Sequence, residues 1–318
     1  MFVIFEGKER PYYTINDYYL KRFKTKVYKI ALNGDFTCPN RDGTFSKSGC
    51  IYCSESGSGE FGGDKSLPLK TQFDHVKEMM SLKWKSGKYI AYFQANTNTY
   101  APVEKLKELF EEALTLDSDI IGISVATRPD CLPEEVLDYL EDLNKRTFLI
   151  IELGLQTIHE TTAKLINRGH DLLSFENAVT NLRKRNIHVV AHIINGLPHE
   201  TKEMMLETLE KVNSYDIQGL KIHMLYILKD TPLEKYYSNT HFHVLTLEEY
   251  TSIVAEQIER LRPDIVLHRL TGDARKEDLI EPIWSLKKFV VTNEIDKRLR
   301  ARHTYQGVYY DYSRNPRT

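Results

Sequence analysis

The stretch CPNRDGTFSKSGCIYCSESGSGEF, residues 38–61, holds three of the four cysteines of the chain. Cys38 is followed by eleven residues and then by a CxxC pair made of Cys50 and Cys53. In a reducing compartment, clustered thiolates typically bind zinc or an iron–sulfur cluster. The surrounding glycines allow tight turns and let backbone N–H groups approach an anionic ligand. We therefore expect this segment to be a loop that wraps around a metal centre.

The fourth ligand separates the two kinds of metal centre. Structural zinc needs four closed ligands, and a Cys3His site with His75 is the zinc alternative, although His75 falls in a stretch predicted to be helical up to Trp84. Cys131 stands beside a predicted helix start, where a small packed side chain is the commoner role. A [4Fe–4S] cluster held by three cysteines leaves one iron open, and that iron can chelate the amino and carboxylate groups of S-adenosylmethionine.

Length and composition restrict the class of protein. The 318 residues are 41% hydrophobic, which suffices for one large α/β domain or two smaller ones. The first residues lack a basic segment followed by a long apolar one, and no later stretch is apolar enough to cross a bilayer. The formal net charge of −2 does not by itself indicate a nucleic-acid binder. We expect a cytoplasmic protein without membrane association.

Short apolar, β-branched runs alternate with amphipathic helical stretches along most of the chain. The runs are VYKIAL (27–32), YIAYFQ (89–94), IIGISV (120–125), FLIIELG (148–154), HVVAHII (188–194), LKIHMLYIL (220–228) and IVLHRL (265–270). This alternation predicts βα units around a parallel sheet. The predicted fold is α/β, a partial (β/α)6 TIM-like barrel with the cysteine loop after its first strand. Periodicity leaves an open Rossmann-like sheet as the alternative.

The predicted barrel occupies the middle of the chain. Residues 1–26 form an N-terminal extension, residues 27–273 the barrel, and residues 274–318 a C-terminal extension. The C-terminal extension is rich in basic and aromatic residues, and we expect it to pack on the barrel.

Polar residues cluster just after the predicted strands, at the edge where parallel α/β folds place their active sites. Glu152 lies within an apolar run, where an unpaired carboxylate is costly, so it should contact either a cofactor or a structural ion-pair partner. Arg128 can bind a carboxylate as a planar fork, or the segment TRPD can simply begin a helix with Asp130 as its cap. Gln156 also stands at a strand end.

A series of ordered motifs resembles one enzyme family. Besides the cysteine loop, the chain carries TRPDCLP (127–133), IELGLQT (151–157), NRGHD (167–171), HIINGLP (192–198) and HRLTGD (268–273). Together they resemble the radical SAM superfamily, specifically the YhcC/YtqA-like group related to the catalytic subunit of Elongator. The resemblance runs from about residue 12 to about residue 273. The first cysteine interval is longer than in the commonest CxxxCxxC motif, as it also is in the Elongator-like branch.

The resemblance implies a cofactor system. Cys38, Cys50 and Cys53 would hold a [4Fe–4S] cluster, whose one-electron reduction cleaves S-adenosylmethionine to methionine and a 5′-deoxyadenosyl radical that abstracts a substrate hydrogen. An electron donor such as flavodoxin or ferredoxin would be the redox partner. Arg128 would face the cofactor carboxylate, and Glu152 its ribose hydroxyls or its ammonium group.

The same resemblance suggests further cofactor contacts. Tyr52 stands where relatives carry an aromatic residue against the adenine, although it can equally be a packing residue of the barrel rim. The usual Gly-Gly-Glu after the second strand is absent, so its role would pass to Gln94, Asn96 or Thr97, which otherwise form a plain polar loop. Gly196, in HIINGLP, would turn the chain against the adenine or form an ordinary βα loop.

The relatedness to Elongator suggests tRNA as the substrate, with remodelling of a wobble-uridine side chain, for example carboxymethylaminomethyluridine to aminomethyluridine. Basic residues also alternate with aromatic ones in 18–29 and 296–314, a combination that suits RNA. The candidate RNA contacts are Lys21, Arg22, Lys24, Lys26, Arg298, Arg300 and Arg302. A solvated basic face is the plainer interpretation of both stretches.

Two other functions remain open from the sequence. One is a radical SAM enzyme that acts on a small metabolite, and the other is a zinc-stabilised RNA-binding protein without catalysis. Histidines offer further candidates for acid–base groups near the barrel mouth. These are His159, His170, His192 and His223.

Overall fold

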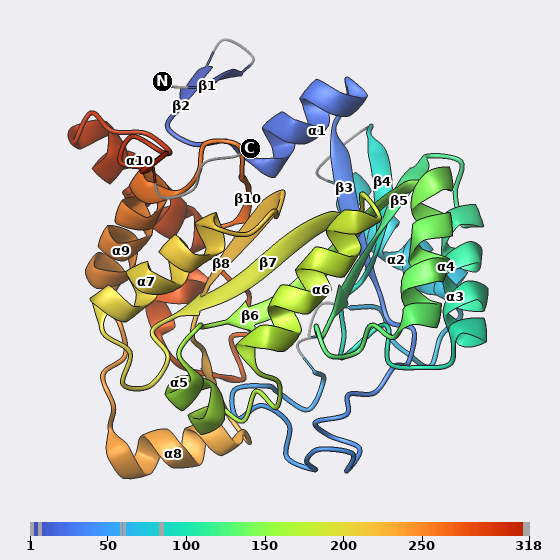
Figure 1. The fold of residues 1–318 in the computed structure, drawn as a ribbon, viewed down its shortest axis with the longest axis horizontal. Coiled ribbons are helices and arrows are strands. Elements are labelled where there is room, and N and C mark those ends of the chain that lie inside the picture. The colour runs from blue at the N-terminus through green and yellow to red at the C-terminus, as the bar shows by residue number, and fades with distance from the viewer. Residues whose placement is uncertain (1–2, 6–7, 58, 60–61, 83–85, 314–318) are drawn as a thin grey trace.

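A curved sheet of seven parallel strands forms the centre of the molecule (Figure 1). The computed structural model describes residues 3–5, 8–57, 59, 62–82 and 86–313. The strands of this sheet are β3 (Val27–Leu32), β4 (Lys88–Phe93), β5 (Ile120–Thr127), β6 (Phe148–Gln156), β7 (His188–Asn195), β8 (Gly219–Met224) and β10 (Val266–Arg269). They pair in the order β10-β8-β7-β6-β5-β4-β3, and every pair is parallel.

Helices follow the strands of this sheet. They are α2 (Leu69–Ser81), α3 (Val103–Thr115), α4 (Glu134–Arg146), α5 (Glu160–Leu165), α6 (Leu172–Lys184), α7 (Lys202–Asn213), α8 (Pro232–Thr240) and α9 (Leu247–Arg260). These helices cover the outer face of the sheet, except that α5 and α8 lie beyond the strand ends (Figure 1). Six strands are thus each followed by one or two helices, and β10 adds a seventh strand. Because neighbours in the sheet follow chain order, no topological switch point exists among the described strands, which excludes the Rossmann-like alternative. The predicted partial barrel is confirmed.

Two local expectations were wrong. The predicted strand 220–228 is two strands, because the chain leaves the sheet after β8 and β9 (Ile227–Leu228) pairs antiparallel with β11 (Leu279–Glu281) of the C-terminal extension. Asp130 does not cap a helix: α4 begins after Pro133, and the Asp130 carboxylate instead binds the Arg128 guanidinium.

The inside of the half-barrel is layered along the strands. Near their amino ends the inward side chains are apolar, and α1 (Ile15–Phe23) closes this end with Tyr19. Tyr19 packs there with Val27, Ile90, Ile150 and Val190. Two residues further along the same strands the inward side chains become polar, as with Lys29, Tyr92, Glu152 and His192. An apolar base therefore supports a polar layer at mid-height.

The two ends of the chain meet at the amino side of the sheet. Besides the hairpin of β1 (Val3–Phe5) and β2 (Lys8–Arg10), the extensions contain a 3-10 turn (Ile283–Leu286) and α10 (Lys288–Ala301). Gln306 N donates to Pro11 O at 2.7 Å, and α10 packs along α9 (Figure 1). The C-terminal extension therefore packs on the barrel. None of the described helices combines the length and apolar character that a membrane crossing needs.

Candidate active site

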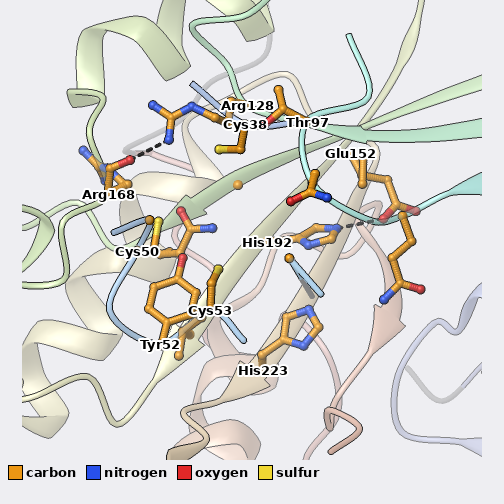
Figure 2. A pocket seen from close by; sticks show the side chains of 18 of the residues that line it. Cys38, Cys50, Tyr52, Cys53, Thr97, Arg128, Glu152, Arg168, His192 and His223 are labelled. Atoms are coloured by element: carbon orange, nitrogen blue, oxygen red, sulfur yellow. Dashed lines mark hydrogen bonds and ion pairs between the residues drawn. The ribbon is translucent and has the colours of Figure 1, made fainter. Parts of the chain in front are cut away.

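One cavity of about 300 Å³ opens at the carboxyl ends of the strands and collects nearly all of the predicted site residues. Its lining includes Cys38, Cys50, Tyr52, Cys53, Gln94, Asn96, Thr97, Arg128, Glu152 and Gln156. Figure 2 shows the cysteines on one side of this space and Glu152 and His192 on the other. Gly196 is not part of the lining, because its turn packs against Leu245 and Met205. Segments distant in sequence thus converge as the strand-end rule predicted, except at Gly196.

The cysteine loop is fastened by the NRGHD segment. Asn167, which has a left-handed backbone with φ of 52°, donates its side-chain amide to Gly49 O at 2.6 Å. Asn40 Nδ2 in turn donates to Asn167 O at 2.6 Å, and Ile51 N donates to Ile166 O at 3.0 Å. These bonds tie both halves of the loop to the segment after α5. The sequence resemblance included NRGHD, but it gave no indication of this clamping role.

Three arginines beside the cysteines build the wall of the cavity. Arg168 is buried and donates to Leu155 O and Thr157 O at 2.9 and 2.7 Å. Arg128 donates to Arg168 O at 2.7 Å (Figure 2). It also forms a two-pronged pair with Asp130. Arg41 donates to backbone carbonyls of the loop itself. The Arg128 fork is therefore already occupied by a protein carboxylate, and its predicted contact with a cofactor carboxylate stays a prediction.

The environment of the thiols suits an anionic ligand set. The pKa of the Cys50 thiol falls to about 6, chiefly because Cys53 donates a hydrogen bond to it; burial opposes this fall, and the Arg128 charge adds to it. Asn40 Nδ2 also points at Cys50 Sγ, at 3.7 Å. A single zinc ion with bonds of about 2.3 Å would require its sulfur ligands to lie within about 4 Å of one another. Among the described residues, no three His, Cys, Asp or Glu side chains are grouped closely enough for a single ion, and His75 lies away on α2. The geometry does not support the Cys3His alternative.

The strand ends carry unusual backbone geometry where they meet the cavity. Asn96 and Gln156 both have φ of 61°, a left-handed conformation that costs about 1–2 kcal/mol for a residue other than glycine. Gln156 Oε1 is buried without a hydrogen-bond partner. Two glycines leave room for these side chains, since a Cβ at Gly154 would lie 2.5 Å from Gln156 Nε2 and one at Gly57 would lie 2.0 Å from Asn96 Oδ1. A buried amide that lacks a hydrogen-bond partner and lies on a strained backbone is typical of a ligand-binding group without its ligand.

Glu152 forms the hub of the polar layer below the cysteines. Its Oε1 is bound by Lys29 and by Ser124, whose Oγ donates at 2.9 Å. Its Oε2 accepts from Tyr92 OH at 2.9 Å, from His192 Nε2 at 2.9 Å and from Lys221 Nζ at 2.5 Å. Burial alone would raise the pKa of this carboxyl, but the two lysines hold it well below its usual range. Glu152 therefore has protein ion-pair partners, as one of its two predicted roles requires. Its other predicted role, a contact with the cofactor, stays a prediction.

Lys29, Tyr92 and Lys221 are site residues that the sequence analysis missed. The sequence did hold a signal for the two lysines. VYKIAL, FLIIELG and LKIHML each place an acidic or basic residue inside a strand that is buried on both faces. Opposite charges in such strands indicate a buried ion pair. Their partners lie 123 and 69 residues apart along the chain, so no local pattern shows the pairing.

Tyr52 and three of the four candidate histidines line the cavity, and Tyr52 also packs against apolar residues beside it. Tyr52 lines the cavity and also packs on a second apolar cluster with Leu225 and Leu233, so both of its predicted roles remain compatible with its position. His170, His192 and His223 line the cavity, whereas His159 does not and bonds to Met204 O. The pKa of His192 falls to about 4 because of burial and then Lys221, which leaves its ring neutral near pH 7.

The predicted basic stretches lie at the other end of the barrel. Arg22 stacks on Phe148, the first residue of β6, and Lys26 immediately precedes β3. On the C-terminal side, Arg298 donates to Thr251 and Arg302 pairs with the buried carboxylate of Glu259. In Figure 1, α1 and α10 lie at the upper edge and the blue cysteine loop at the lower edge. These residues therefore lie at the amino ends of the strands, away from the cavity, and their contact with RNA stays a prediction.

Comparison with known proteins agrees with this fold and cavity. Residues 40–212 match the model of the Radical SAM superfamily, and residues 217–301 match the Radical_SAM C-terminal domain, a range that crosses the predicted boundary at residue 273. The chain belongs to the radical SAM superfamily. Members of this superfamily use a [4Fe–4S] cluster and S-adenosylmethionine, and the three cysteines on the loop after β3 fit the ligand set of such a cluster.

Within this superfamily, the chain is similar to several individual proteins. YtqA of Bacillus subtilis is 50% identical over 306 residues, covering 96% of this chain and 95% of YtqA. YhcC of Escherichia coli is 34% identical over 288 residues, covering 90% of this chain and 91% of YhcC. The solved structure of Methanocaldococcus infernus Elp3 superposes with a TM-score of 0.66 at 15% identity, covering 88% of this chain and 64% of that one.

Two more distant sequence matches cover about half of the chain. Elongator complex protein 3 of Saccharomyces cerevisiae is 24% identical over 156 residues, which is 48% of this chain and 28% of the yeast protein. The tRNA uridine(34) acetyltransferase of Dehalococcoides mccartyi is 24% identical over 170 residues, which is 51% of this chain and 36% of that protein.

Proposed function

We propose that this radical SAM enzyme modifies the side chain of a wobble uridine in tRNA, for example by converting carboxymethylaminomethyluridine to aminomethyluridine. The observation that carries the proposal is the similarity of this chain both to Elongator complex protein 3 and to a tRNA uridine(34) acetyltransferase. Each similarity covers only part of the other protein. The fold likeness to Methanocaldococcus infernus Elp3 over 88% of this chain supports the same relationship. A shared barrel with a shared class of substrate is the simplest account of that similarity.

In this proposal, the residues of the cavity have different roles according to their position. Cys38, Cys50 and Cys53 would hold the [4Fe–4S] cluster, and that group together with S-adenosylmethionine supplies one-electron chemistry when bound. Gln156, whose carbonyl oxygen is buried without a partner, would bind a polar group of the cofactor. Asn96 stands in the same strained geometry after β4 and would do the same. Arg41 bonds to backbone carbonyls of the loop and would so keep the thiolates in place.

The basic residues at the amino end of the barrel do not adjoin the reaction site. In this proposal the nucleotide enters at the carboxyl ends of the strands, where the cysteine loop presents Phe45 with 58% of its surface exposed. Arg128 lies beneath that ring, at 5.9 Å from its centroid. An exposed aromatic ring backed by a cation is a suitable stacking surface for an unpaired base.

The test compares tRNA nucleosides by mass spectrometry in cells that lack the gene and in cells complemented with the wild type or with Cys50→Ala. We expect the carboxymethylaminomethyl nucleoside to accumulate without the gene and to return to normal only with the wild type. The purified protein, reconstituted anaerobically, should hold about four irons and release 5′-deoxyadenosine when given dithionite and S-adenosylmethionine. Deoxyadenosine release with no altered tRNA nucleoside would contradict the tRNA proposal and favour a small-metabolite substrate.

A further inference from the structure

The polar layer beneath the cavity carries more positive than negative charge. Lys29 and Lys221 share the single carboxylate of Glu152, and the imidazole of His192 is neutral near pH 7. The lysine side chains are 19% and 9% exposed, and Glu152 is fully buried. A buried charge without a counter-charge is costly, so this layer, whose net charge is near +1 when Lys221 is protonated, favours the arrival of an anion.

Of the two lysines in this layer, Lys221 is the one that lines the cavity. Both Lys221 and Glu152 line it, whereas Lys29 does not. The carboxylate of Glu152 already accepts from five protein groups, which leaves it little capacity for a ligand. An ammonium group has three donors, and Lys221 uses two of them, on Glu152 and on Tyr92 OH at 3.2 Å. Among the described residues, no other acceptor lies within hydrogen-bond distance of Lys221 Nζ.

The groups around Lys221 explain why its charge is available to a ligand. It stands on β8 and faces Glu152 on β6, Lys29 on β3, His192 on β7 and Arg269 on β10. Burial lowers the pKa of Lys221 to about 7, Glu152 opposes that change, and the repulsion from Lys29 and Arg269 adds to it. Arg269 has its own partner in Asp273. A second anion at Lys221 would relieve the repulsion and stabilise the ammonium form.

We propose that Lys221 binds a carboxylate group of a ligand in the cavity, with Glu152 and Tyr92 holding the ammonium group in position. A monoanionic carboxylate matches both the single remaining donor and the net charge of the layer. Two ligands can bring this group, namely the methionine end of S-adenosylmethionine and a carboxymethyl group on the substrate. The second source rests on the proposed function, and the first does not.

The test uses the full-length protein, reconstituted anaerobically, as wild type, Lys221→Met and Lys221→Arg. Lys202→Met is the matched control, because Lys202 pairs with Glu256 on the outside of the barrel. Equilibrium dialysis gives the affinity for S-adenosylmethionine, and deoxyadenosine formation gives KM for tRNA with or without the carboxymethyl group. Lys221→Met should weaken one carboxylate ligand about tenfold or more, and Lys221→Arg should retain most of the binding.

The pattern of loss identifies the source of the carboxylate. A loss confined to S-adenosylmethionine affinity assigns it to the cofactor, and a loss confined to KM for carboxymethylated tRNA assigns it to the substrate. Unchanged values for both ligands in Lys221→Met would overturn the proposal. Iron content and circular dichroism verify that each variant is folded and loaded.

A second measurement depends neither on activity nor on RNA. Competitive acylation followed by mass spectrometry reports the reactivity of Lys221 in the wild type, in sodium acetate and in sodium chloride of equal ionic strength. If acetate raises the pKa of Lys221 from about 7 to about 8, the reactive neutral fraction at about pH 7.5 falls about threefold. Protection by acetate without any tRNA turnover would remove the proposed function and leave this site standing. Equal acylation of Lys221 in the two salts would overturn the site itself.

Discussion

Replacing Glu152 by Gln tests whether the polar layer is a set of compensated buried charges. The change keeps the size of the side chain but leaves Lys29 and Lys221 without a carboxylate. Removing one partner of a buried ion pair costs about 3–5 kcal/mol, a large part of a total stability of about 5–15 kcal/mol. The cost should be greater at low pH than at high pH, because a lysine with a lowered pKa becomes neutral as the pH rises and so relieves the repulsion.

The assay is urea denaturation of the apo-protein, followed by circular dichroism, at a pH below and a pH above the pKa of Lys221. Glu256→Gln is the control, because its partners Lys202 and Arg260 lie on the outer surface, and it should cost less than about 1 kcal/mol. The double variant Glu152→Gln with Lys29→Met restores the net charge of the wild-type layer and should recover part of the loss. A Glu152→Gln variant as stable as the control, or a double variant no better than Glu152→Gln, would refute the reasoning.

Three further predictions follow from individual contacts. Asn167→Ala removes the bond to the cysteine loop and should lower iron incorporation while changing the free energy of unfolding by about 1 kcal/mol or less; full iron loading would contradict the clamp. The wild type should gain stability relative to Lys221→Met as the pH rises from about 7 to about 10, because the unfolded lysine binds a proton there and the folded one does not; a parallel pH dependence of the two urea midpoints would refute this. Arg302→Ala leaves Glu259 buried without its cation and should cost about 1–3 kcal/mol with no change in KM for tRNA; a raised KM with unchanged stability would restore the predicted RNA contact.

The strands and the cysteine loop were predictable because their signals are local. Each apolar run except 220–228 matches one strand to within a few residues, and the three clustered cysteines lie on one loop. The splitting of 220–228 was not predictable, because β9 owes its separate direction to β11, about fifty residues later in the chain. The clamp by Asn167 escaped prediction for the same reason, since its amide bonds to Gly49, 118 residues earlier.

The basic stretches show how composition can mislead about position. Arg298 and Arg302, candidate RNA contacts because they alternate with aromatic residues, both bond to groups on α9, and their contact with RNA stays a prediction. Arg22 lies over Phe148 at the amino end of β6. A run of basic and aromatic residues fits a packed extension as well as it fits a nucleic-acid surface, since long basic side chains cover apolar surface with their stems. The direction of the strands fixes which end of the barrel holds the site. Composition alone does not show at which end a basic stretch lies.

The position of the polar layer argues that it serves the reaction more than the fold. The apolar side chains at the amino end already close the barrel, with Tyr19 at its base. A buried ion pair is often matched or exceeded in stability by apolar residues of the same volume, so Lys29, Glu152 and Lys221 are not needed to hold the strands together. They occur only at the height where the barrel opens into the cavity, and the ammonium group of Lys221 is the part left partly unsatisfied. A layer that costs stability at the floor of the active-site cavity is best explained by a ligand that completes it.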